Sequence, residues 1–248
     1  VGSEMCIRDR GWGRAPALHT KCARFRKCSR ALEFLMKILV QKFGGTSVAD
    51  LECQKKVLAK VKRGLDNGYK VVAVLSARHG DTNNLLALAR EWSAQPDPAE
   101  CDSLVSTGEQ VSISLFTMLL KDNGIKARSL LAWQIPLITD DSFGSARIES
   151  IDGEAIRKLF NDYDVLVIAG FQGKTADGRI TTLGRGGSDT SAVAIAAVLD
   201  SCECEIYTDV DGVYTTDPNV CKSARKIDKI SYDAVSYTHL TLPTNSLV

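Results

Sequence analysis

Two segments of the chain combine glycines with charged side chains in a way that is typical of anion binding. The first, KFGGTS at residues 42–47, places a lysine beside two glycines, whose backbone amides can approach a phosphate closely. The second, GRGGSDT at residues 184–190, opens a predicted helix and carries a guanidinium, a hydroxyl and a carboxylate. The alternatives are a solvated lysine at a strand end and a surface loop with an incidental arginine. Together the two segments favour a small ligand that bears phosphate.

The chain contains neither GxGxxG nor GxxxxGK[ST], so a Rossmann dinucleotide site and a Walker P-loop are disfavoured. Two further polar segments follow predicted strands. Residues 75–82 present the hydroxyls of Ser76 and Thr82, although both residue types are also common helix caps. Residues 208–218 form a polar loop whose Tyr214 suits a base or a ribose, although the loop is equally an ordinary turn. We therefore expect a phosphate site of another kind.

Hydrophobic periodicity predicts the elements that position these four segments. The predicted strands are residues 38–42, 70–75, 126–131, 165–169 and 203–208, and the predicted helices are residues 51–65, 85–92, 110–120, 153–159 and 190–199. Asp50 is a plausible N-cap of the first helix, and Asn67-Gly68 is a plausible stop. This alternation indicates an α/β fold with a mainly parallel sheet covered by helices on both faces. Since ligands bind beyond the carboxyl ends of such strands, the four segments should meet at one rim.

Composition narrows the classes of function. Over 248 residues the chain is 44% hydrophobic and 25% charged with a net charge of +1, which gives no reason to expect nucleic acid or membrane partners. Its eight cysteines lack CxxC pairing and accompanying histidines. We interpret them as reduced thiols of a cytoplasmic protein and assign no metal site.

The two ends of the chain do not match its middle. Residues 1–35 are rich in Arg, Lys, Gly and Cys and show neither helical nor strand periodicity, so we interpret them as a non-native or disordered leader. Residues 235–248 break the preceding pattern and look like a non-native tail. The domain itself is expected at residues 36–234.

Seven motifs occur in an order and approximate spacing that resemble the catalytic domain of aspartate kinases. They are KFGGTSV, LSARHGDTN, STGEQVS, WQIPLITDDSFGSARI, GFQG, TTLGRGGSDTSA and TDVDGVYTTDP. The resemblance covers roughly residues 37–232. It implies the amino acid kinase fold, which is a three-layer α/β/α sandwich with a largely parallel central sheet.

The resemblance also implies catalytic and nucleotide-binding roles. Lys42 resembles the lysine that contacts the transferring phosphoryl group, and Asp189 resembles the acid that organises this lysine and the reacting groups. The resemblance places Phe43, Gly44 and Gly45 among the ATP-binding residues, and the two glycines would place backbone amides on the phosphates. Residues of the last polar loop would contact the adenosine of the nucleotide, namely Thr208, Asp209, Tyr214 and Asn219. Asn219 stands where many relatives have arginine.

The same resemblance implies an amino-acid subsite. Glu109 looks like the carboxylate that receives the α-ammonium group, although an acid near a helix start also complements the helix dipole. Arg185 looks like the guanidinium that holds the α-carboxylate. Ser76, Thr82 and Ser188 are similar in position to hydroxyls that line the pocket. Mg²⁺ is expected on the ATP phosphates, with few protein ligands.

The implied activity is transfer of the ATP γ-phosphate to the side-chain carboxylate of L-aspartate, the first step of lysine, threonine and methionine synthesis. The alternatives are another amino acid kinase, acting on acetylglutamate or glutamate, and an inactive nucleotide-binding fragment. The family continues with a helix, a glycine-alanine-lysine turn and regulatory ACT domains. We therefore expect this chain to be truncated at its C-terminus and poorly active, and the full-length form to be a homo-oligomer.

Overall fold

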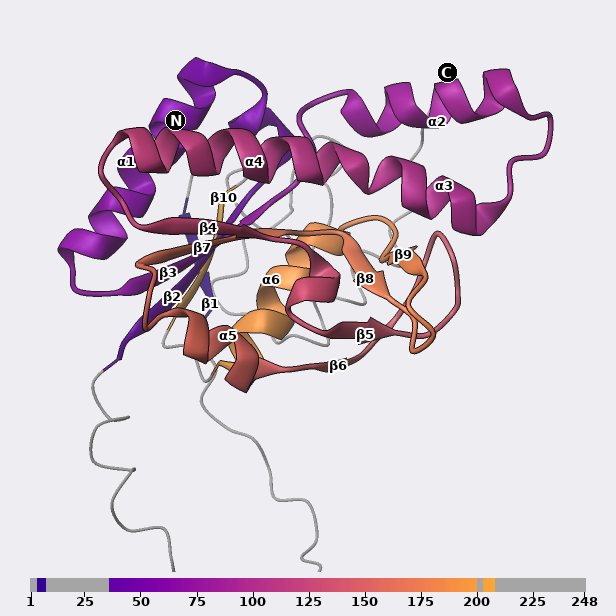
Figure 1. The fold of residues 1–248 in the computed structure, drawn as a ribbon. Coiled ribbons are helices and arrows are strands. Elements are labelled where there is room, and N and C mark those ends of the chain that lie inside the picture. The colour runs from indigo at the N-terminus through magenta and orange to yellow at the C-terminus, as the bar shows by residue number, and fades with distance from the viewer. Residues whose placement is uncertain (1–3, 8–35, 200–202, 208–248) are drawn as a thin grey trace, which may run out of the picture.

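The computed structural model describes residues 4–7, 36–199 and 203–207 (Figure 1). Its strands are β1 (Glu4–Ile7), β2 (Ile38–Phe43), β3 (Lys70–Leu75), β4 (Ala127–Leu130), β5 (Leu137–Thr139), β6 (Ile148–Ile151), β7 (Val165–Ala169), β8 (Gln172–Lys174), β9 (Ile180–Thr182) and β10 (Glu203–Tyr207). Its helices are α1 (Leu51–Asp66), α2 (Asp81–Trp92), α3 (Pro98–Val105), α4 (Thr107–Asp122), α5 (Gly153–Leu159) and α6 (Gly187–Val198), with short 3-10 helices η2 (Gly45–Val48) and η3 (Ala132–Gln134).

The central sheet has the strand order β1-β10-β2-β3-β7-β4. The five strands from β10 to β4 run parallel, and β1 pairs antiparallel with β10. The register aligns Tyr207 with Phe43, Phe43 with Leu75, and Leu75 with Ala169. The carboxyl ends of four strands therefore stand in one row, which brings their following loops to a common rim.

Helices cover both faces of this sheet, as Figure 1 shows for α1 and α4 on one side and α5 and α6 on the other. Successive residues of β3 pack into the hydrophobic cores on opposite faces of the sheet, because side chains alternate along a strand. Val71, Ala73 and Leu75 pack with α1 and α4, while Val72 and Val74 pack with α5 and α6. The predicted three-layer α/β/α sandwich is confirmed.

A second, smaller sheet was not predicted from the sequence. Its strand order is β6-β5-β8-β9, and it packs against α3 through β9 and against α6 through β6 and β8 (Figure 1). Three of its strands have only three residues each, too few to show a periodicity. Two of its strands, β8 and β9, carry the chain between β7 and α6 and so bring the second glycine segment to the rim.

Most predicted elements lie where the sequence put them, with shifted ends. The start and stop of α1 are as predicted, since the Asp50 carboxylate accepts a hydrogen bond from Cys53 N at 2.8 Å and Gly68 follows the C-cap Asn67 with a φ of 79°. Helix α3 was missed, although Asp97 caps it and proline stands at its first turn. Strand β1 was also missed, because residues 1–35 gave no strand signal.

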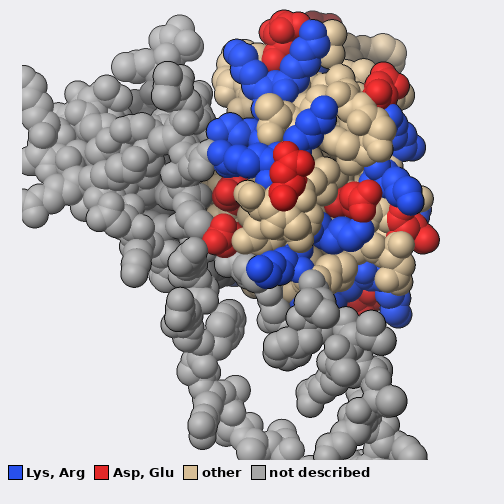
Figure 2. Space-filling model, turned by 90° about the vertical axis from the view of Figure 1, so that its left-hand side faces the viewer, with Lys and Arg blue, Asp and Glu red and all other residues tan. Residues whose placement is uncertain are grey.

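One face of the molecule is of mixed charge (Figure 2). On the face drawn in Figure 2, basic and acidic side chains lie interspersed over the described residues, and neither sign forms a continuous patch. Among the described helices, none combines the length and the apolar character that crossing a bilayer requires.

Candidate active site

A cavity of about 590 Å³ lies at the rim formed by the carboxyl ends of the parallel strands. The loop after β2, the loop after β3, the start of α4 and the segment that opens α6 all contribute to its wall. The lining residues are Lys42, Gly44, Gly45, Thr46, Ser76, Ala77, His79, Thr82, Leu86, Glu109, Gly144, Phe171, Gly184, Arg185, Gly186, Gly187, Ser188 and Asp189. The two glycine segments, more than a hundred residues apart in the chain, therefore face one space.

An ion pair joins the two glycine segments inside this cavity. The Lys42 Nζ atom lies 2.7 Å from Asp189 Oδ1, and the side chains are only 9% and 17% exposed. Lys42 is the penultimate residue of β2, and Asp189 stands in the first turn of α6. Pairing fixes the ammonium between the two segments, so that its charge is available to a ligand at a defined position.

The first glycine segment is held tightly against its neighbours. An added Cβ at Gly45 would lie 2.8 Å from the Ala77 carbonyl oxygen, so only glycine allows the loops after β2 and β3 to approach this closely. An added Cβ at Gly44 would lie 3.5 Å from Lys42 Nζ, which places this residue beside the ammonium. The Gly44 N–H donates to the Tyr207 carbonyl at 3.2 Å, so in this structure it is committed to β10.

Phe43, which the sequence grouped with the ATP-binding residues, does not line the cavity. Its side chain is 1% exposed and stacks on the Tyr207 ring, with 4.9 Å between the ring centroids. The ring belongs to the core shared with α1 and α4. As the last residue of a strand buried on both faces, Phe43 supports the glycine segment from behind.

Glu109 is a buried carboxylate with one oxygen unpaired. It is 2% exposed, its Oε1 accepts a hydrogen bond from Ala77 N at 2.9 Å, and its Oε2 has no hydrogen-bond partner among the described residues. An added Cβ at Gly108 would lie 2.8 Å from Ala77 Cβ, so this glycine lets α4 bring the carboxylate against the loop after β3. Because buried polar atoms are nearly always paired, the orphaned oxygen marks a place for a donor supplied by a ligand.

The environment of Glu109 disfavours its charged form. Burial raises the pKa of its carboxyl from the ordinary 4.5 to about 7, and the negative charge of Asp81 acts in the same direction. Hydrogen-bond donation from the backbone of Ala77 lowers the pKa by less. Glu109 also lies in the first turn of α4, as expected for an acid that complements a helix dipole. Complementation of the helix dipole accounts for the position of Glu109 in α4 but leaves its burial and its unpaired oxygen unexplained.

The second glycine segment turns sharply into α6. Gly184 and Gly186 have φ values of 74° and 72°, a region that glycine alone occupies without strain. Between them Arg185 lines the same cavity as Lys42, which is the juxtaposition that the sequence hypothesis required. Ser188 follows and is 8% exposed.

The sequence-predicted residues thus divide into three groups. The cavity brings together Lys42, Gly44, Gly45, Ser76, Thr82, Glu109, Arg185, Ser188 and Asp189. Phe43 lies behind it. The four residues predicted for the adenosine side, namely Thr208, Asp209, Tyr214 and Asn219, lie outside the described residues.

Sequence reasoning gave no role to several residues that line the cavity, among them His79, Leu86, Gly144 and Phe171. Phe171 has a φ of 68°, unusual for a residue with a side chain, and its N–H donates to Ser191 Oγ at 3.1 Å. The GFQG motif marked this segment as belonging to the family pattern. Nothing in a local pattern, however, indicates a left-handed phenylalanine.

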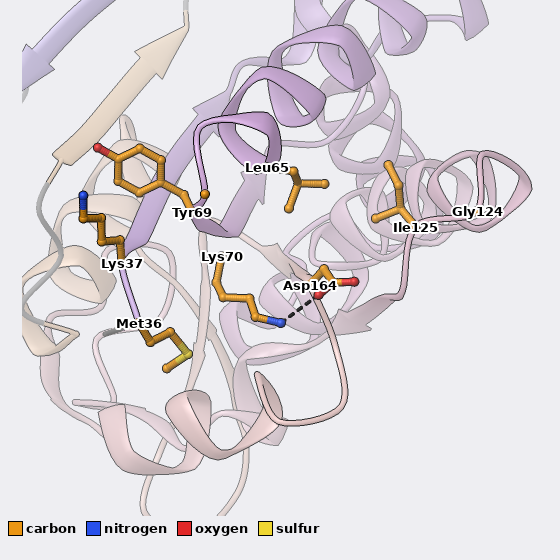
Figure 3. A pocket seen from close by; sticks show the side chains of 9 residues that line it. Met36, Lys37, Leu65, Tyr69, Lys70, Gly124, Ile125 and Asp164 are labelled. Carbon is orange, nitrogen blue, oxygen red and sulfur yellow. Dashed lines mark hydrogen bonds and ion pairs between the residues drawn. The ribbon is translucent and has the colours of Figure 1, made fainter. Parts of the chain in front are cut away.

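A second cavity, of about 670 Å³, lies at the amino ends of the strands, where β2, β3 and β7 begin (Figure 3). Lys70 and Asp164 line it, and the Lys70 Nζ atom lies 2.7 Å from Asp164 Oδ1 and donates to the Tyr163 carbonyl at 3.0 Å. These two charges satisfy each other. Since ligands of open α/β sheets bind at the carboxyl ends of the strands, we place the candidate active site in the first cavity.

Comparison with known proteins agrees with this geometry. A family model described as "Amino acid kinase family" matches residues 37–241 of the chain. The chain belongs to the amino acid kinase family. The family prediction made from the seven motifs is thereby confirmed.

Several members of this family that are named aspartate kinases resemble the chain. An aspartate kinase of Pseudomonas putida is 52% identical over 198 residues, which are 80% of this chain and 48% of that protein. The solved structure of E. coli aspartokinase III in complex with lysine and aspartate is 32% identical with a TM-score of 0.66, and the match covers 78% of this chain and 54% of that one. The same enzyme in complex with aspartate and ADP is 31% identical with a TM-score of 0.63, over 77% and 53% of the two chains. The chain spans about half the length of the curated relatives it matches.

Proposed function

We propose that the protein transfers the γ-phosphate of ATP to the side-chain carboxylate of L-aspartate. One observation carries this proposal: the Lys42–Asp189 ion pair shares a cavity with Arg185 and with Glu109, which has one unpaired carboxylate oxygen. A cation beside glycine turns suits the phosphates, while an acid and a guanidinium suit the two α-groups of a free amino acid. The relatives named aspartate kinases support the same substrate.

On the amino-acid side, Glu109 would receive the α-ammonium group through Oε2. A bound ammonium supplies the missing donor and a positive charge, which favours the ionised carboxylate despite its burial. Arg185 would hold the α-carboxylate, and Ser76, Thr82 and Ser188 would offer hydroxyls to the remaining polar atoms. The side-chain carboxylate of the substrate would then extend toward Lys42.

On the phosphate side, Lys42 would contact the transferring group, and Asp189 would keep the ammonium in place. The acceptor carboxylate is already ionised at neutral pH, so it needs orientation and charge neutralisation rather than a general base. Lys42 provides a point positive charge toward the phosphoryl oxygens as charge spreads over them. Mg²⁺ bound to the ATP phosphates would neutralise further charge, with few ligands from the protein.

The adenosine side is assigned to the loop after β10, with Thr208, Asp209, Tyr214 and Asn219. What supports this assignment is the hydrogen bond from Gly44 N to the Tyr207 carbonyl, because it places the carboxyl end of β10, which precedes this loop in the chain, beside the first glycine segment. Homo-oligomerisation and a cytoplasmic location of the full-length protein stay predictions. So does its place at the start of lysine, threonine and methionine synthesis.

Another amino acid kinase activity is the main competing function. An acylated substrate such as acetylglutamate has no ammonium for the unpaired oxygen of Glu109, so the buried acid favours a free amino acid. Glutamate differs from aspartate by one methylene, which a pocket discriminates only modestly. A substrate panel therefore decides between them.

The test is formation of acyl phosphate, trapped with hydroxylamine as the acyl hydroxamate, by the full-length protein with ATP. L-aspartate, L-glutamate and N-acetyl-L-glutamate are compared, and L-aspartate should give the highest kcat/KM. Lys42→Ala should lower kcat by roughly a hundredfold, because charge stabilisation in the transition state is lost. Lys55→Ala is the control, since this exposed lysine pairs with Glu52 and is not among the residues that line the cavity. No hydroxamate from L-aspartate, or an unchanged rate in Lys42→Ala, would reject the proposal.

A further inference from the structure

Asp102 is a buried carboxylate that belongs to none of the motifs recognised in the sequence. It lies in α3 and is 2% exposed. Its Oδ2 atom accepts hydrogen bonds from Gly144 N at 2.9 Å and from Thr182 N at 2.7 Å, and its Oδ1 atom accepts one from Thr182 Oγ1 at 2.8 Å. Three donors from two distant segments thus converge on one side chain.

Both segments lead to the amino-acid half of the candidate active site. Gly144 lines the cavity itself, and Thr182 ends β9 two residues before Gly184 and three before Arg185. The segments also contact each other, because Ala146 N donates to the Thr182 carbonyl at 2.8 Å and an added Cβ at Gly184 would lie 3.2 Å from the Gly144 carbonyl oxygen. Asp102 accepts hydrogen bonds from both segments at this contact.

We propose that Asp102 is a positioning residue that sets the distance between the Arg185 segment and Glu109. Helix α3 runs directly into α4, since Ser106 is both the C-cap of α3 and the N-cap of α4. Asp102 and Glu109 are therefore carried by one continuous pair of helices. By binding Thr182 and Gly144, Asp102 ties the segment that bears the guanidinium to the helices that bear the acid. This inference rests on the proposed function, in which these two groups bind the α-groups of L-aspartate.

The physical basis is the pairing of backbone donors. Without Asp102 the N–H groups of Gly144 and Thr182 would lose their acceptor, and an unpaired N–H at Thr182, which is 2% exposed, is strongly disfavoured. The segments would move apart to reach water, and Arg185 would move with them. An asparagine, by contrast, can keep all three bonds: its amide oxygen accepts from the two N–H groups, and the Thr182 hydroxyl turns to accept from its NH₂ group.

The experiment compares Asp102→Ala, Asp102→Asn and the control Asp152→Ala in the full chain. Asp152 is a matched aspartate that accepts a backbone hydrogen bond, from Ala155 N, as the N-cap of α5. Dissociation constants for L-aspartate and for MgADP are measured separately by calorimetry. Hydrogen exchange is followed in peptides that cover residues 140–147 and 180–186.

Asp102→Ala should raise the dissociation constant for L-aspartate roughly tenfold and leave that for MgADP within about twofold. Amide exchange should accelerate in both peptides but not in β2 or β3. Asp102→Asn should stay close to the wild type in both readouts, because hydrogen bonding rather than charge does the positioning. Asp152→Ala should unfold at a lower temperature with both dissociation constants unchanged.

The inference is overturned if Asp102→Ala binds L-aspartate as tightly as the wild type, or if both ligands weaken equally. If Asp102→Ala does not fold, Thr182→Val takes its place, and unchanged affinity and exchange in that variant reject the inference. Failure of the proposed function looks different, since the wild type itself would then not bind L-aspartate. In that case amide hydrogen exchange in the two peptides still decides whether Asp102 positions the segments of Gly144 and Thr182.

Discussion

At the scale of single residues, the unusual feature is a carboxylate kept away from water beside a cavity. Burial raises the pKa of Glu109 to about 7, so the proton is bound more tightly in the folded than in the unfolded protein. The stability that this group contributes is full below about pH 4.5 and is lost as the pH rises through about 7. A group that weakens the fold at neutral pH is typical of a binding residue rather than of a core residue.

The prediction at this scale concerns Glu109→Gln. The amide cannot ionise, so between pH 5 and pH 8 the variant should gain roughly 2–3 kcal/mol of unfolding free energy relative to the wild type. It should also lose affinity for L-aspartate, because the ionic partner of the ammonium is gone. Urea unfolding at the two pH values and calorimetric titration with L-aspartate measure the two effects. A parallel pH dependence in both proteins would contradict the raised pKa of Glu109.

At the scale of elements, the site depends on how closely the loops after β2 and β3 and the start of α4 can approach. Glycines at positions 45 and 108 remove the side chains that would keep these elements apart. Because these two residues have no Cβ, the elements pack closely enough to bring Lys42 and Glu109 to one cavity. The sequence showed that glycines were present but not which backbone each would touch.

Gly45→Ala tests this close approach. The new Cβ would meet the Ala77 carbonyl oxygen at 2.8 Å, so we expect a loss of roughly 1–3 kcal/mol in stability and weaker binding of MgADP. Gly68→Ala is the control: its φ of 79° makes alanine unfavourable by about 1 kcal/mol, but no heavy atom lies within 4 Å of the added Cβ. Thermal unfolding and nucleotide titration separate the two variants. Equal nucleotide affinity in both would show that the approach at Gly45 has no functional role.

At the scale of the whole molecule, the cavity is built from both sides of the sheet. Glu109 comes from α4, which packs on one face, and Asp189 comes from α6, which packs on the other. A ligand that contacts both therefore links the two hydrophobic cores. Folding and binding should be coupled over the entire molecule rather than in one layer.

L-aspartate should accordingly stabilise the folded protein as a unit. At a concentration a hundred times its dissociation constant it should add about 2.7 kcal/mol to the unfolding free energy. N-acetyl-L-aspartate is the matched control, because it keeps both carboxylates and lacks the ammonium that Glu109 would bind. Unfolding followed by circular dichroism measures the shift. Equal stabilisation by the two compounds would argue against the role of Glu109.

The sequence by itself determined the layered fold, the succession of the main strands along the chain and the family. Runs such as residues 165–169 are apolar throughout because the strand is buried on both faces, and a continuous apolar run is recognisable in a short stretch of sequence. The glycine segments were recognisable because glycines beside charged residues form a pattern within a few positions of the chain. The short strands of the second sheet left no comparable signal, and the signal of α3 was confined to its start, with Asp97 as the cap and a proline in the first turn.

Only the tertiary structure decided which groups share an environment. The raised pKa of Glu109, the three donors gathered on Asp102 and the left-handed Phe171 all depend on contacts between segments far apart in the chain. Such contacts follow from strand register and helix packing, which align Phe43, Leu75 and Ala169 in one row. A linear pattern specifies which side chains are present at a rim, whereas their distances and their burial arise only when the layers close around them.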